Sequence, residues 1–545
     1  MCQSHIEGRR IPIPLPNTGT MSRRRSSFCL RTSLVIFLVL FIFLQLHIMS
    51  YSDSRDTHIN DVTNDSTAAI LSMVPPVFHK FLTSKAKNVS HDHNGSAANG
   101  GEMQFHSPNI TEMKRAIYRY NEMQSVINED IFGPLQNDSV IIVVQVHKRI
   151  TYLRHLIVSL AQARDISKAL LIFSHDHYDE DINELVQSVD FCKVMQIFYP
   201  YSIQTHPNEF PGADPRDCPR DMKKEQALIK KCNNALYPDL YGHYREAKFT
   251  QTKHHWWWKA NRVFNELEVT RFHSGLVVFL EEDHYVAEDF LYLLGLMQKR
   301  SHDLCPKCNV LSLGTYLKTF NYYTYSNNKS NKKAFFGQSR AAAASNSNAM
   351  GLNTHTNNNA NNYHGGGGIL MESIPVTTTE KYSAQWGYQV LPSLYSIYQK
   401  VEVTPWISSK HNMGMAFNRT TWREILKCAE HFCSYDDYNW DWSLQHVSQH
   451  CLKQRLHVMV VKGPRVFHIG ECGVHHKKNN CESNQVISKV QKVLHIATKA
   501  AQLFPKTITL TVASVVQKTK LRKGNGGWGD KRDHLLCLNM TLSYR

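Results

Sequence analysis

Blocks of apolar residues alternate with amphipathic stretches through the middle of the chain. Residues 152–163 have the apolar spacing of a helix, whereas several shorter runs are apolar throughout. These runs, typical of buried strands, occupy residues 139–147, 169–176, 194–199, 276–280 and 309–314. Strands that alternate with helices predict a parallel sheet covered by helices on both faces, which is an α/β fold.

A different apolar pattern lies near the N-terminus. Residues 33–49 (SLVIFLVLFIFLQLHIM) are nearly all apolar and, with their flanks, are long enough to cross a bilayer as a helix. Arginines precede this run, so we expect residues 1–31 to be a cytosolic tail, 32–50 a transmembrane signal anchor, and the remainder lumenal. A cleaved signal peptide is the alternative, but no clean small-residue cleavage pattern follows.

Glycosylation sequons and cysteines agree with a lumenal location. The sequons lie beyond the apolar run, at Asn64, Asn88, Asn94, Asn109, Asn137, Asn328, Asn418 and Asn539. Of the 13 cysteines, Cys2 and Cys29 lie in the predicted tail, which leaves an odd number for an oxidising compartment. We therefore expect disulfides, a tight Cys305–Cys308 bridge among them, and one free thiol, with Cys192 in an apolar context as the candidate.

Two stretches have a composition that cannot form a core. Residues 51–114 are rich in Ser, Asn, His and Thr and are predicted to be a glycosylated stem. Between about 321 and 385 the chain is dominated by Asn, Ser, Ala and Gly, which predicts a disordered insertion within a catalytic domain spanning 115–545. A linker between two domains is the alternative for this second stretch.

The overall charge invites a nucleic-acid function but does not support one. The 545-residue chain is 42% hydrophobic and 20% charged, with a formal net charge of +16. Its basic residues are spread along the chain, and no recognisable nucleic-acid-binding module accompanies them, so we predict no nucleic-acid partner. A basic surface also attracts anionic sugar nucleotides or membrane headgroups.

Polar residues follow the predicted strands at the edge where parallel sheets bind ligands. They are residues 145–149 (QVHKR), Ser174 to Asp176, and Glu281 to Asp283. Together they offer hydrogen bonds for a base and ribose, positive charge for phosphates, and carboxylates for a metal. One such end alone is weak evidence because strand ends often meet water, but several at one edge predict a ligand site.

A divalent cation would explain the acidic end of the strand at 276–280. Carboxylate and imidazole ligands suit Mn²⁺, and His468, which follows another apolar run, is the second candidate ligand. A lone histidine of this kind is otherwise an ordinary core residue. A zinc site built from Cys472, His475, His476 and Cys481 is conceivable by ligand type, but an oxidising lumen favours a Cys472–Cys481 disulfide.

Two aromatic stretches allow both a functional and a structural interpretation. Residues 433–445 (CSYDDYNWDWSLQ) place acids among aromatic rings, which suits a sugar platform with a general base, or else an aromatic core patch with solvated acids. Residues 251–264 (QTKHHWWWKANRVF) combine helical core packing by three tryptophans with Lys253, His254 and His255 as candidate phosphate contacts.

Several of these strings resemble a known family. In chain order, "QVHKR", "FSHD", "PNEFPGADPRDCPRD", "GHYREAKFTQTKHHWWWK", "FLEEDHY", "VLSLGTY", "HNMGMAF", "YDDYNWDW", "CGVHHKK" and "NGGWGDKRDH" are similar to the N-acetylglucosaminyltransferase II family. The resemblance runs from about residue 115 to the C-terminus and is interrupted by the Asn-rich insertion.

The resemblance implies a function, a fold and a location. It implies a single-pass type II protein of the Golgi membrane with a GT-A fold, a Rossmann-like nucleotide-sugar-binding architecture. The implied reaction is Mn²⁺-dependent, inverting transfer of GlcNAc from UDP-GlcNAc, in β-1,2 linkage, to the α-1,6-arm mannose of N-glycans, which leads from hybrid to complex type. The same-class alternative acts on the α-1,3 arm, and the alternative from another class is a non-catalytic glycan-binding protein. The oligomeric state is left open, with a homodimer as one option.

The resemblance also implies roles for individual residues. Asp441 would be the catalytic base, Asp283 and His468 would bind Mn²⁺, and Glu281 and Trp440 would contact the acceptor. The donor-binding residues would be Gln145, Val146, His147, Lys148, Arg149, Asp176, Gln251, Thr252, Lys253, His254 and His255.

The family's disulfides and one departure complete the comparison. The implied pairs are Cys218–Cys232, Cys305–Cys308, Cys428–Cys451, Cys433–Cys537 and Cys472–Cys481. Relatives carry a donor-contacting arginine soon after "LSLGTY", where this chain reads "LKTFNYYTYS". Lys318 and Arg340 are the candidate replacements.

Overall fold

A computed structural model describes the larger part of the chain. The described residues are 70–83, 109–314, 323–325, 388–390, 398–470, 483–511 and 524–542. Residues 71–545 group into one compact unit, to which the following description applies. The predicted cytosolic tail and signal anchor lie outside the described residues, as do Lys318 and Arg340. Within the described part of the chain, no helix is both long and apolar enough to span a bilayer.

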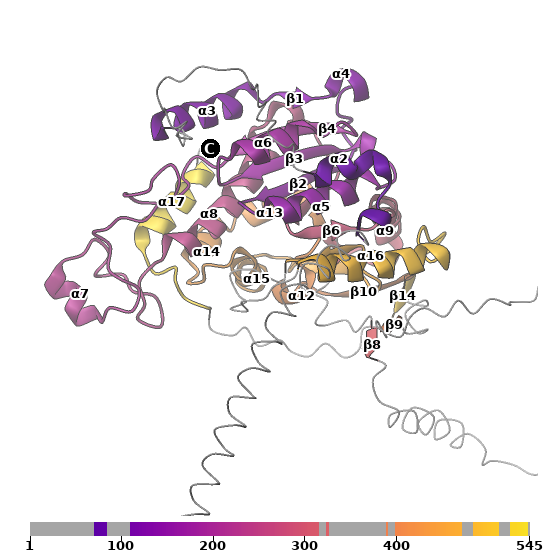
Figure 1. Cartoon of the computed structure of the whole chain (residues 1–545). Helices are drawn as coiled ribbons and strands as arrows, with labels where there is room; N and C mark the ends of the chain where they lie inside the picture. Colours follow the sequence, from indigo (N-terminus) through magenta and orange to yellow (C-terminus); the bar gives the residue numbers. More distant parts are fainter. Residues whose placement is uncertain are drawn as a thin grey trace, which may run out of the picture. The chain divides into compact units, whose positions relative to one another are not determined.

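A large mixed sheet forms the centre of this unit, in the strand order β1-β4-β3-β2-β5-β11-β7-β12-β10-β14 (Figure 1). The strands are β1 (Val126–Ile127), β2 (Ile141–Val146), β3 (Leu170–His175), β4 (Lys193–Phe198), β5 (Val277–Glu281), β7 (Val310–Ser312), β10 (Lys400–Pro405), β11 (Met415–Phe417), β12 (His457–Val461) and β14 (Thr509–Thr511). Two further pairs stand apart from this sheet, β6 (His284–Val286) with β13 (Val466–His468) and β8 (Tyr323–Tyr325) with β9 (Tyr388–Val390).

The predicted strands are present, and the neighbours β4, β3, β2 and β5 are parallel as expected. The sheet as a whole is mixed, because β11 runs antiparallel between β5 and β7, β1 pairs antiparallel with β4, and β10 pairs antiparallel with β12 but parallel with β14. Strand β11 has only three residues and begins after Gly414, whose φ of +57° turns the chain. So short a strand leaves no clear alternation in the sequence.

The helices lie around the sheet. They are α2 (His79–Leu82), α3 (Ile110–Met123), α4 (Glu129–Phe132), α5 (Ile150–Ala161), α6 (Glu180–Gln187), α7 (Lys224–Lys230), α8 (Ala247–Asn261), α9 (Phe290–Leu304), α12 (Ser408–His411), α13 (Arg419–Leu426), α14 (Ala429–Ser434), α15 (Trp440–His450), α16 (Ser483–Lys499) and α17 (Lys531–Leu542). Shorter turns are the 3-10 helices η1 (Pro76–Phe78), η2 (Ile166–Lys168) and η4 (Glu268–Thr270) and the π-helix η3 (Arg262–Glu266).

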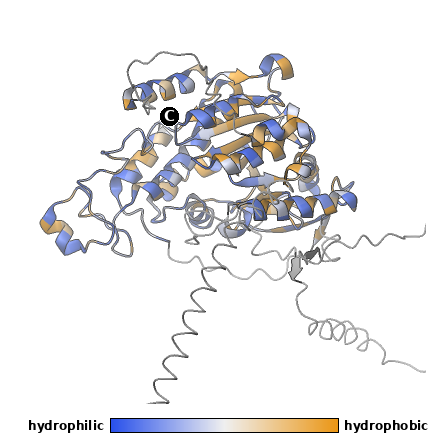
Figure 2. Ribbon diagram, in the orientation of Figure 1, coloured by the Kyte–Doolittle hydropathy of each residue, from blue (hydrophilic) through white to orange (hydrophobic). Residues whose placement is uncertain are grey.

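Alternate residues of the central strands pack into two separate cores. Ile142 and Val144 of β2 face a core shared with α5, α6 and α9, whereas Ile141 and Val143 face a core shared with α8, α13, α14 and α15. Figure 2 shows the apolar strands lying between helices that are hydrophilic on their outer sides. Because successive strand residues point to opposite faces, the polar residues at the strand ends are divided between these two sides as well.

The small β6–β13 pair connects distant parts of the sequence. Its register places His468 opposite His284, one residue after Asp283. The pairing of β8 with β9 likewise brings the two sides of the Asn-rich stretch together, which favours an insertion over a linker between domains. Strand β8 begins inside the span predicted to be disordered, so that span starts too early, while residues 326–387 lie outside the described residues.

The predicted stem also needs correction. Helix α2 lies within residues 51–114, and its Phe81 is fully buried in the core beside α5. The Arg154 guanidinium donates to the carbonyl oxygens of Phe81 and Thr83, at 2.9 and 3.1 Å. Helix α3 begins at Ile110, before the expected domain start, and is capped by the Asn109 side chain. A single buried anchor such as Phe81 produces no periodicity that the sequence could reveal.

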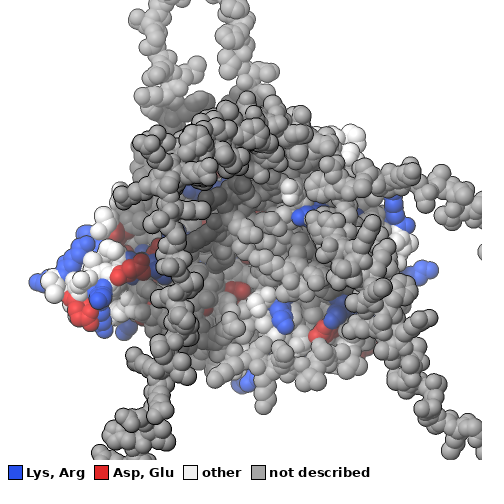
Figure 3. Space-filling model, turned by 60° about the horizontal axis from the view of Figure 1, so that its bottom comes forward, with Lys and Arg blue, Asp and Glu red and all other residues white. Residues whose placement is uncertain are grey.

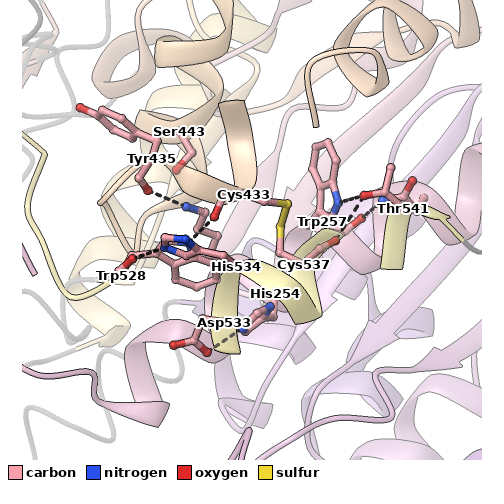
Figure 4. The surroundings of a disulfide bond; sticks show 12 residues. His254, Trp257, Cys433, Tyr435, Ser443, Trp528, Asp533, His534, Cys537 and Thr541 are labelled. Carbon is pink, nitrogen blue, oxygen red and sulfur yellow. Dashed lines mark hydrogen bonds and ion pairs between the residues drawn. A yellow bond between two sulfur atoms is a disulfide. The ribbon is translucent and has the colours of Figure 1, made fainter. Parts of the chain in front are cut away.

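The C-terminal segment is fixed against α8 and α14 (Figure 4). A disulfide joins Cys433 to Cys537 across 104 residues of sequence, and the Trp528 indole donates to the Cys433 carbonyl. Below it, the buried Asp533 accepts from Arg245 at 2.8 Å and from His254 at 2.9 Å. The C-terminal segment therefore packs against α8 and holds it in place.

Four of the five implied disulfides are present. They are Cys218–Cys232, Cys305–Cys308, Cys428–Cys451 and Cys433–Cys537. Cys472 and Cys481 lie outside the described residues, together with His475 and His476. Among the described cysteines, Cys192 is free and buried, as predicted.

Charged side chains of both signs occur together on the lobe that carries α7. Figure 3 shows blue and red atoms interspersed there. In this lobe Arg216 pairs with Asp214, and Arg220 pairs with Asp221 and Glu246. Such pairing gives this lobe a mixed surface.

Replacing Asp533 by Asn should lower the stability of the fold. The variant removes the closest carboxylate from the buried Arg245 and leaves Asp217, at 3.4 Å, as its remaining acidic partner. Breaking a buried ion pair typically costs about 3–5 kcal/mol. Arg245 and His254 outweigh burial and hold the pKa of Asp533 at about 2. A lowered pKa stabilises the fold above the unfolded pKa of about 3.9, so the difference between parent and variant should fade as the pH falls through this range.

Thermal melting at pH 7 and at pH 3 measures this effect. The control is Asp221→Asn, which breaks an exposed pair with Arg220 and should change stability by less than about 1 kcal/mol. Equal melting temperatures for Asp533→Asn and the parent at pH 7 would contradict a supporting role for this ion pair.

Candidate active site

The carboxyl ends of β3, β2 and β5 form the candidate site. Ser174, Gln145 and Glu281 are partners in register across these strands, so their side chains share one face of the sheet. They continue the rows of apolar residues that pack against α8. Strand order reverses at β2, because the chain moves from β2 outward to β3 and β4 and then returns to β5 on the other side. Open α/β sheets bind ligands at such a switch point.

Glu282 organises the loop after β2. This carboxylate is 2% exposed and accepts from the backbone N–H of His147 at 2.6 Å and from Arg149 Nε at 2.7 Å. Burial raises the pKa of Glu282, although the charge of Arg149 opposes this. Glu282 therefore holds the QVHKR loop in place, a structural role that keeps its side chain away from any ligand.

Asp283 lies between two cationic partners. Its Oδ2 is 2.8 Å from an Arg149 nitrogen and 3.2 Å from His468 Nε2. Burial opposes ionisation, but His468 and Arg149 outweigh it and hold the pKa of Asp283 well below its ordinary value. The Gly470 backbone packs so closely that a Cβ there would lie 2.0 Å from Asp283 Oδ2. The carboxylate is thus ionised and fixed in place.

The donor atoms here fit a divalent cation. Ligand atoms of Glu281, Asp283 and His284 lie within 4.8 Å of one another. Asp283 Oδ1 is buried and has no hydrogen-bond partner among the described residues. The backbone N–H of Glu281 donates to His284 Nδ1 at 3.2 Å, so the other ring nitrogen of neutral His284 carries the proton and cannot bind a metal. Glu281 and Asp283, with His468 beside them, remain as the ligand set.

Asp176 joins the ends of β2 and β3 to α8. Its carboxylate is 2.5 Å from His147 Nδ1 and 3.3 Å from His255 Nδ1. Although burial opposes it, these two histidines hold the pKa of Asp176 far below its ordinary value. Ser174 Oγ completes the group at 2.8 Å from His255 Nε2. Predicted residues from separate parts of the sequence thus meet here.

The predicted donor stretch 251–255 does not act as a unit. Successive residues on a helix point about 100° apart, so five in a row cannot face one ligand. The Gln251 amide oxygen accepts from the Ile203 N–H, Thr252 is exposed, and the Lys253 ammonium donates to the Tyr435 and Asp437 carbonyls. His254 points to Asp533 (Figure 4), which leaves His255 as the member that reaches the strand edge.

Val146 requires a similar correction. Its side chain is fully buried in the α5 core and cannot contact a donor. Its carbonyl oxygen accepts from the Asp176 N–H at 3.2 Å. His147 and Lys148 are exposed, so the loop offers their side chains and that of Arg149.

Asp441 lies in the first turn of α15. Its carboxylate accepts from the Asn412 amide at 3.3 Å and from the Trp442 N–H at 3.0 Å. Burial and then the charges of Asp437 and Glu281 raise the pKa of Asp441 to about 7. Asn412 precedes β11, which pairs antiparallel with β5 through Met415 and Phe279, so the hydrogen bond from Asn412 places Asp441 near the carboxyl end of β5. A carboxylate with a pKa near neutrality is suited to accept a proton.

Trp440 is largely a core residue. Its ring stacks on Trp256 with a centroid separation of 4.4 Å, and 7% of the residue is exposed. An acceptor sugar could therefore touch its edge, but the residue does not offer an open aromatic platform. In the 433–445 stretch, Trp440 therefore has the structural role, whereas Asp441 keeps the geometry of a functional group.

Lys259 is a site residue that the sequence analysis did not identify. It is one helical turn after His255, on the same face of α8, and its ammonium donates to Gln145 Oε1 at 2.5 Å. The helical period applied to "HHWWWK" would have placed it beside His255.

Comparisons with known proteins identify the family of this chain. The sequence model of N-acetylglucosaminyltransferase II (MGAT2) matches residues 114–362 and 385–537. Alpha-1,6-mannosyl-glycoprotein 2-beta-N-acetylglucosaminyltransferase of Rattus norvegicus is 40% identical over 79% of this chain and 80% of the relative. Its Homo sapiens counterpart is 39% identical over 79% of each chain, and that of Arabidopsis thaliana is 29% identical over 79% and 81%. The crystal structure of S. aureus TarS 1-349 aligns with a TM-score of only 0.25, at 9% identity over 68% of this chain and 75% of that chain.

The α/β fold, the polar strand ends and these matches define a glycosyltransferase that uses a UDP-GlcNAc donor. The chain belongs to the N-acetylglucosaminyltransferase II family.

Proposed function

We propose that the chain transfers GlcNAc from UDP-GlcNAc, with inversion and in β-1,2 linkage, to the α-1,6-arm mannose of N-glycans, leading from hybrid to complex type. The names of the relatives support the acceptor. The observation that carries the chemistry is the hydrogen bond between Asp441 and Asn412 near the carboxyl end of β5, because Asp283 with its partner His468 follows that same strand end. This arrangement supports a base and a cation site at one edge of a GT-A-like sheet.

The residues of the chain supply the proton transfer and the positioning. Asp441 accepts the proton of the mannose 2-hydroxyl while the oxygen of that hydroxyl bonds to the anomeric carbon of GlcNAc. The bond from that carbon to the β-phosphate oxygen breaks, and UDP leaves with the electron pair. Asn412 orients the Asp441 carboxylate, and the guanidinium of Arg149, fixed by Glu282, stabilises negative charge on the diphosphate. General-base assistance of this kind contributes about 10²- to 10⁴-fold.

A divalent cation, in our proposal Mn²⁺, would be held by Asp283 and His468 with Glu281 adjacent. When bound, such an ion neutralises charge on a leaving diphosphate. His468 must be neutral to bind the metal. Burial lowers the pKa of His468, but the neighbouring Asp283 outweighs burial and raises it. Metal affinity should therefore increase with pH.

The proposed location is the Golgi membrane. The apolar run 32–50 and the basic residues before it support a type II anchor with a lumenal catalytic domain. The disulfides joining Cys218 to Cys232 and Cys433 to Cys537 support an oxidising compartment. Partners in this proposal are UDP-GlcNAc, the N-glycans of glycoproteins, and the membrane.

Turnover of UDP-GlcNAc by the full chain, with a defined hybrid glycan and Mn²⁺, tests the function. We expect a β-1,2-linked product on the α-1,6 arm, established by linkage analysis, and loss of turnover on adding a chelator. A product on the α-1,3 arm would replace the proposed acceptor. Glycan binding without turnover would replace the enzyme by a glycan-binding protein.

The rate should depend on pH through Asp441. The base must be ionised, and its pKa of about 7 means that kcat should rise about tenfold per unit below pH 7 and level off above it. A cation bound beside Glu281 lowers the midpoint of this pH profile, but kcat still rises with pH. Measurements of kcat from pH 5 to 8.5 at saturating donor, acceptor and Mn²⁺ give the profile, and a flat profile would contradict the assignment.

A further inference from the structure

We propose that Lys259 is a positioning residue for the donor: it fixes the Gln145 amide so that its N–H groups face the nucleotide site. This inference rests on the proposed function, because it assigns a role to residues beside the donor. Neither the sequence motifs nor the family resemblance pointed to Lys259.

The position of Lys259 follows from the fold. Residue 259 is in the last turn of α8, and its side chain, 1% exposed, lies beneath the ends of β2 and β5. Its ammonium is 2.5 Å from Gln145 Oε1. Glu281, in register with Gln145 on the neighbouring strand, and Asp176 stabilise the charge of Lys259.

The chemistry of lysine fixes the orientation of the amide. In its protonated form, Lys259 has three N–H donors and no acceptor, so only the oxygen of Gln145 can face it. The Gln145 Nε2, on the other side of the same amide, must then point away from Lys259. Gln145 is half-buried at the carboxyl end of β2, beside the switch point of the sheet. A free glutamine could present either its oxygen or its nitrogen to a ligand, whereas this one presents donors.

A buried ammonium is expensive, which argues against an incidental contact. Burial lowers the pKa of Lys259 to about 7, although Glu281 and Asp176 oppose the shift. A leucine or methionine would fill the same space beside Phe279 at lower cost. The oxygens of a nucleotide, in its base, ribose and phosphates, are acceptors and match the donors that Lys259 imposes on Gln145.

The affinity for UDP tests the inference. Four variants of the full chain are compared at saturating Mn²⁺: Lys259→Met, Gln145→Leu, their double mutant, and Gln145→Glu. Loss of one neutral hydrogen bond corresponds to about a three- to tenfold increase in Kd, so we expect Lys259→Met and Gln145→Leu each to raise the Kd of UDP by this factor. Because Lys259 acts through Gln145, the double mutant should bind no more weakly than Gln145→Leu alone.

Gln145→Glu separates positioning from a purely structural role. It keeps an acceptor for Lys259 and replaces the amide N–H groups by a carboxylate oxygen, so we expect an unchanged melting temperature and at least a threefold increase in the Kd of UDP. The KM of UDP-GlcNAc should follow the Kd, while kcat at saturating donor changes by a smaller factor.

Three results would overturn the inference. The first is a Kd of UDP within twofold of the parent for Lys259→Met. The second is an increase in Kd for the double mutant that equals the product of the increases in the two single mutants. The third is a Kd within twofold of the parent for Gln145→Glu. The last decides the matter if Lys259→Met does not fold. A parent chain that does not bind UDP would instead overturn the proposed function, on which this inference depends.

Discussion

Asp441→Asn should nearly abolish turnover while leaving the binding of UDP intact. The substitution keeps the shape of the side chain and removes its ability to accept a proton, so kcat should fall by about 10²- to 10⁴-fold. The Kd of UDP should stay within about twofold of the parent, because in the proposed reaction Asp441 contacts the acceptor hydroxyl and not the nucleotide. Steady-state kinetics and calorimetric titration with UDP measure the two quantities.

The same variant should be more stable than the parent at alkaline pH. Burial and the charges of Asp437 and Glu281 raise the pKa of Asp441 from 3.8 to about 7, so the folded state binds this proton more tightly than the unfolded state. The ionised carboxylate therefore costs stability above pH 7, by up to about 4 kcal/mol, and costs nothing below the unfolded pKa. Asp441→Asn should gain this amount at pH 8 and lose the gain as the pH falls towards 4.

Exposed Asp303→Asn is the matched control and should change neither kcat nor the melting temperature. Near-normal turnover of Asp441→Asn would show that another group is the base. An unchanged melting temperature at pH 8, with turnover abolished, would show that the carboxylate is better solvated than its surroundings indicate.

Asp283→Asn should remove metal-dependent turnover. Asp283 is the carboxylate best placed to bind a cation, and a metal ion that stabilises a leaving group supplies several kcal/mol of transition-state stabilisation. We expect the Kd of Mn²⁺ to rise at least about 100-fold and kcat at moderate Mn²⁺ to fall about 10³-fold. Electron paramagnetic resonance of free Mn²⁺ measures the affinity, and the same samples give the rate.

A second variant changes the geometry and keeps every ligand. Gly470→Ala would bring a Cβ to 2.0 Å from Asp283 Oδ2 and within 3 Å of its Cβ and Cγ, so the carboxylate must move. Mn²⁺ affinity should fall in this variant too. Turnover that survives both substitutions, or that persists with a chelator, would contradict a metal site at Asp283.

The two carboxylates should have opposite effects on stability. His468 and Arg149 hold the pKa of Asp283 low despite its burial, so its charge stabilises the folded state above the unfolded pKa of about 3.9 and this contribution is lost as the pH falls. Asp283→Asn should therefore lower the melting temperature at pH 8, where Asp441→Asn raises it. A comparison of the two variants separates a carboxylate held by cations from one left without a cationic partner.

The local pattern of the sequence was sufficient for the strands and for several site residues. Long apolar runs end in polar groups at Gln145, Asp176 and Glu281, and the structure places all of these at one sheet edge. This worked because parallel strands have the same direction, so that their carboxyl ends meet wherever the helices between them pack. The resemblance to relatives added the pairing of Cys433 with Cys537, which no local pattern could supply.

The donor residues that the resemblance implied as consecutive runs do not all point to one site. Assigning all of 251–255 to the donor ignored the turn of α8, which directs Lys253 and His254 to the C-terminal segment. Val146 was carried over from the resemblance as part of the run 145–149, although the pleat of β2 turns its side chain into the core.

The sequence by itself determined the α/β class, the polar strand ends and the acidic end of β5, because these depend on the alternation of side chains over a few residues. Only the tertiary structure decided which of these groups are charged and what they face. It brought His468 to Asp283 through the pairing of β13 with β6, placed Lys259 under Gln145, and raised the pKa of Asp441 by burial beside Asp437 and Glu281. The physical reason is that desolvation and charge–charge distances depend on residues that are far apart in the chain.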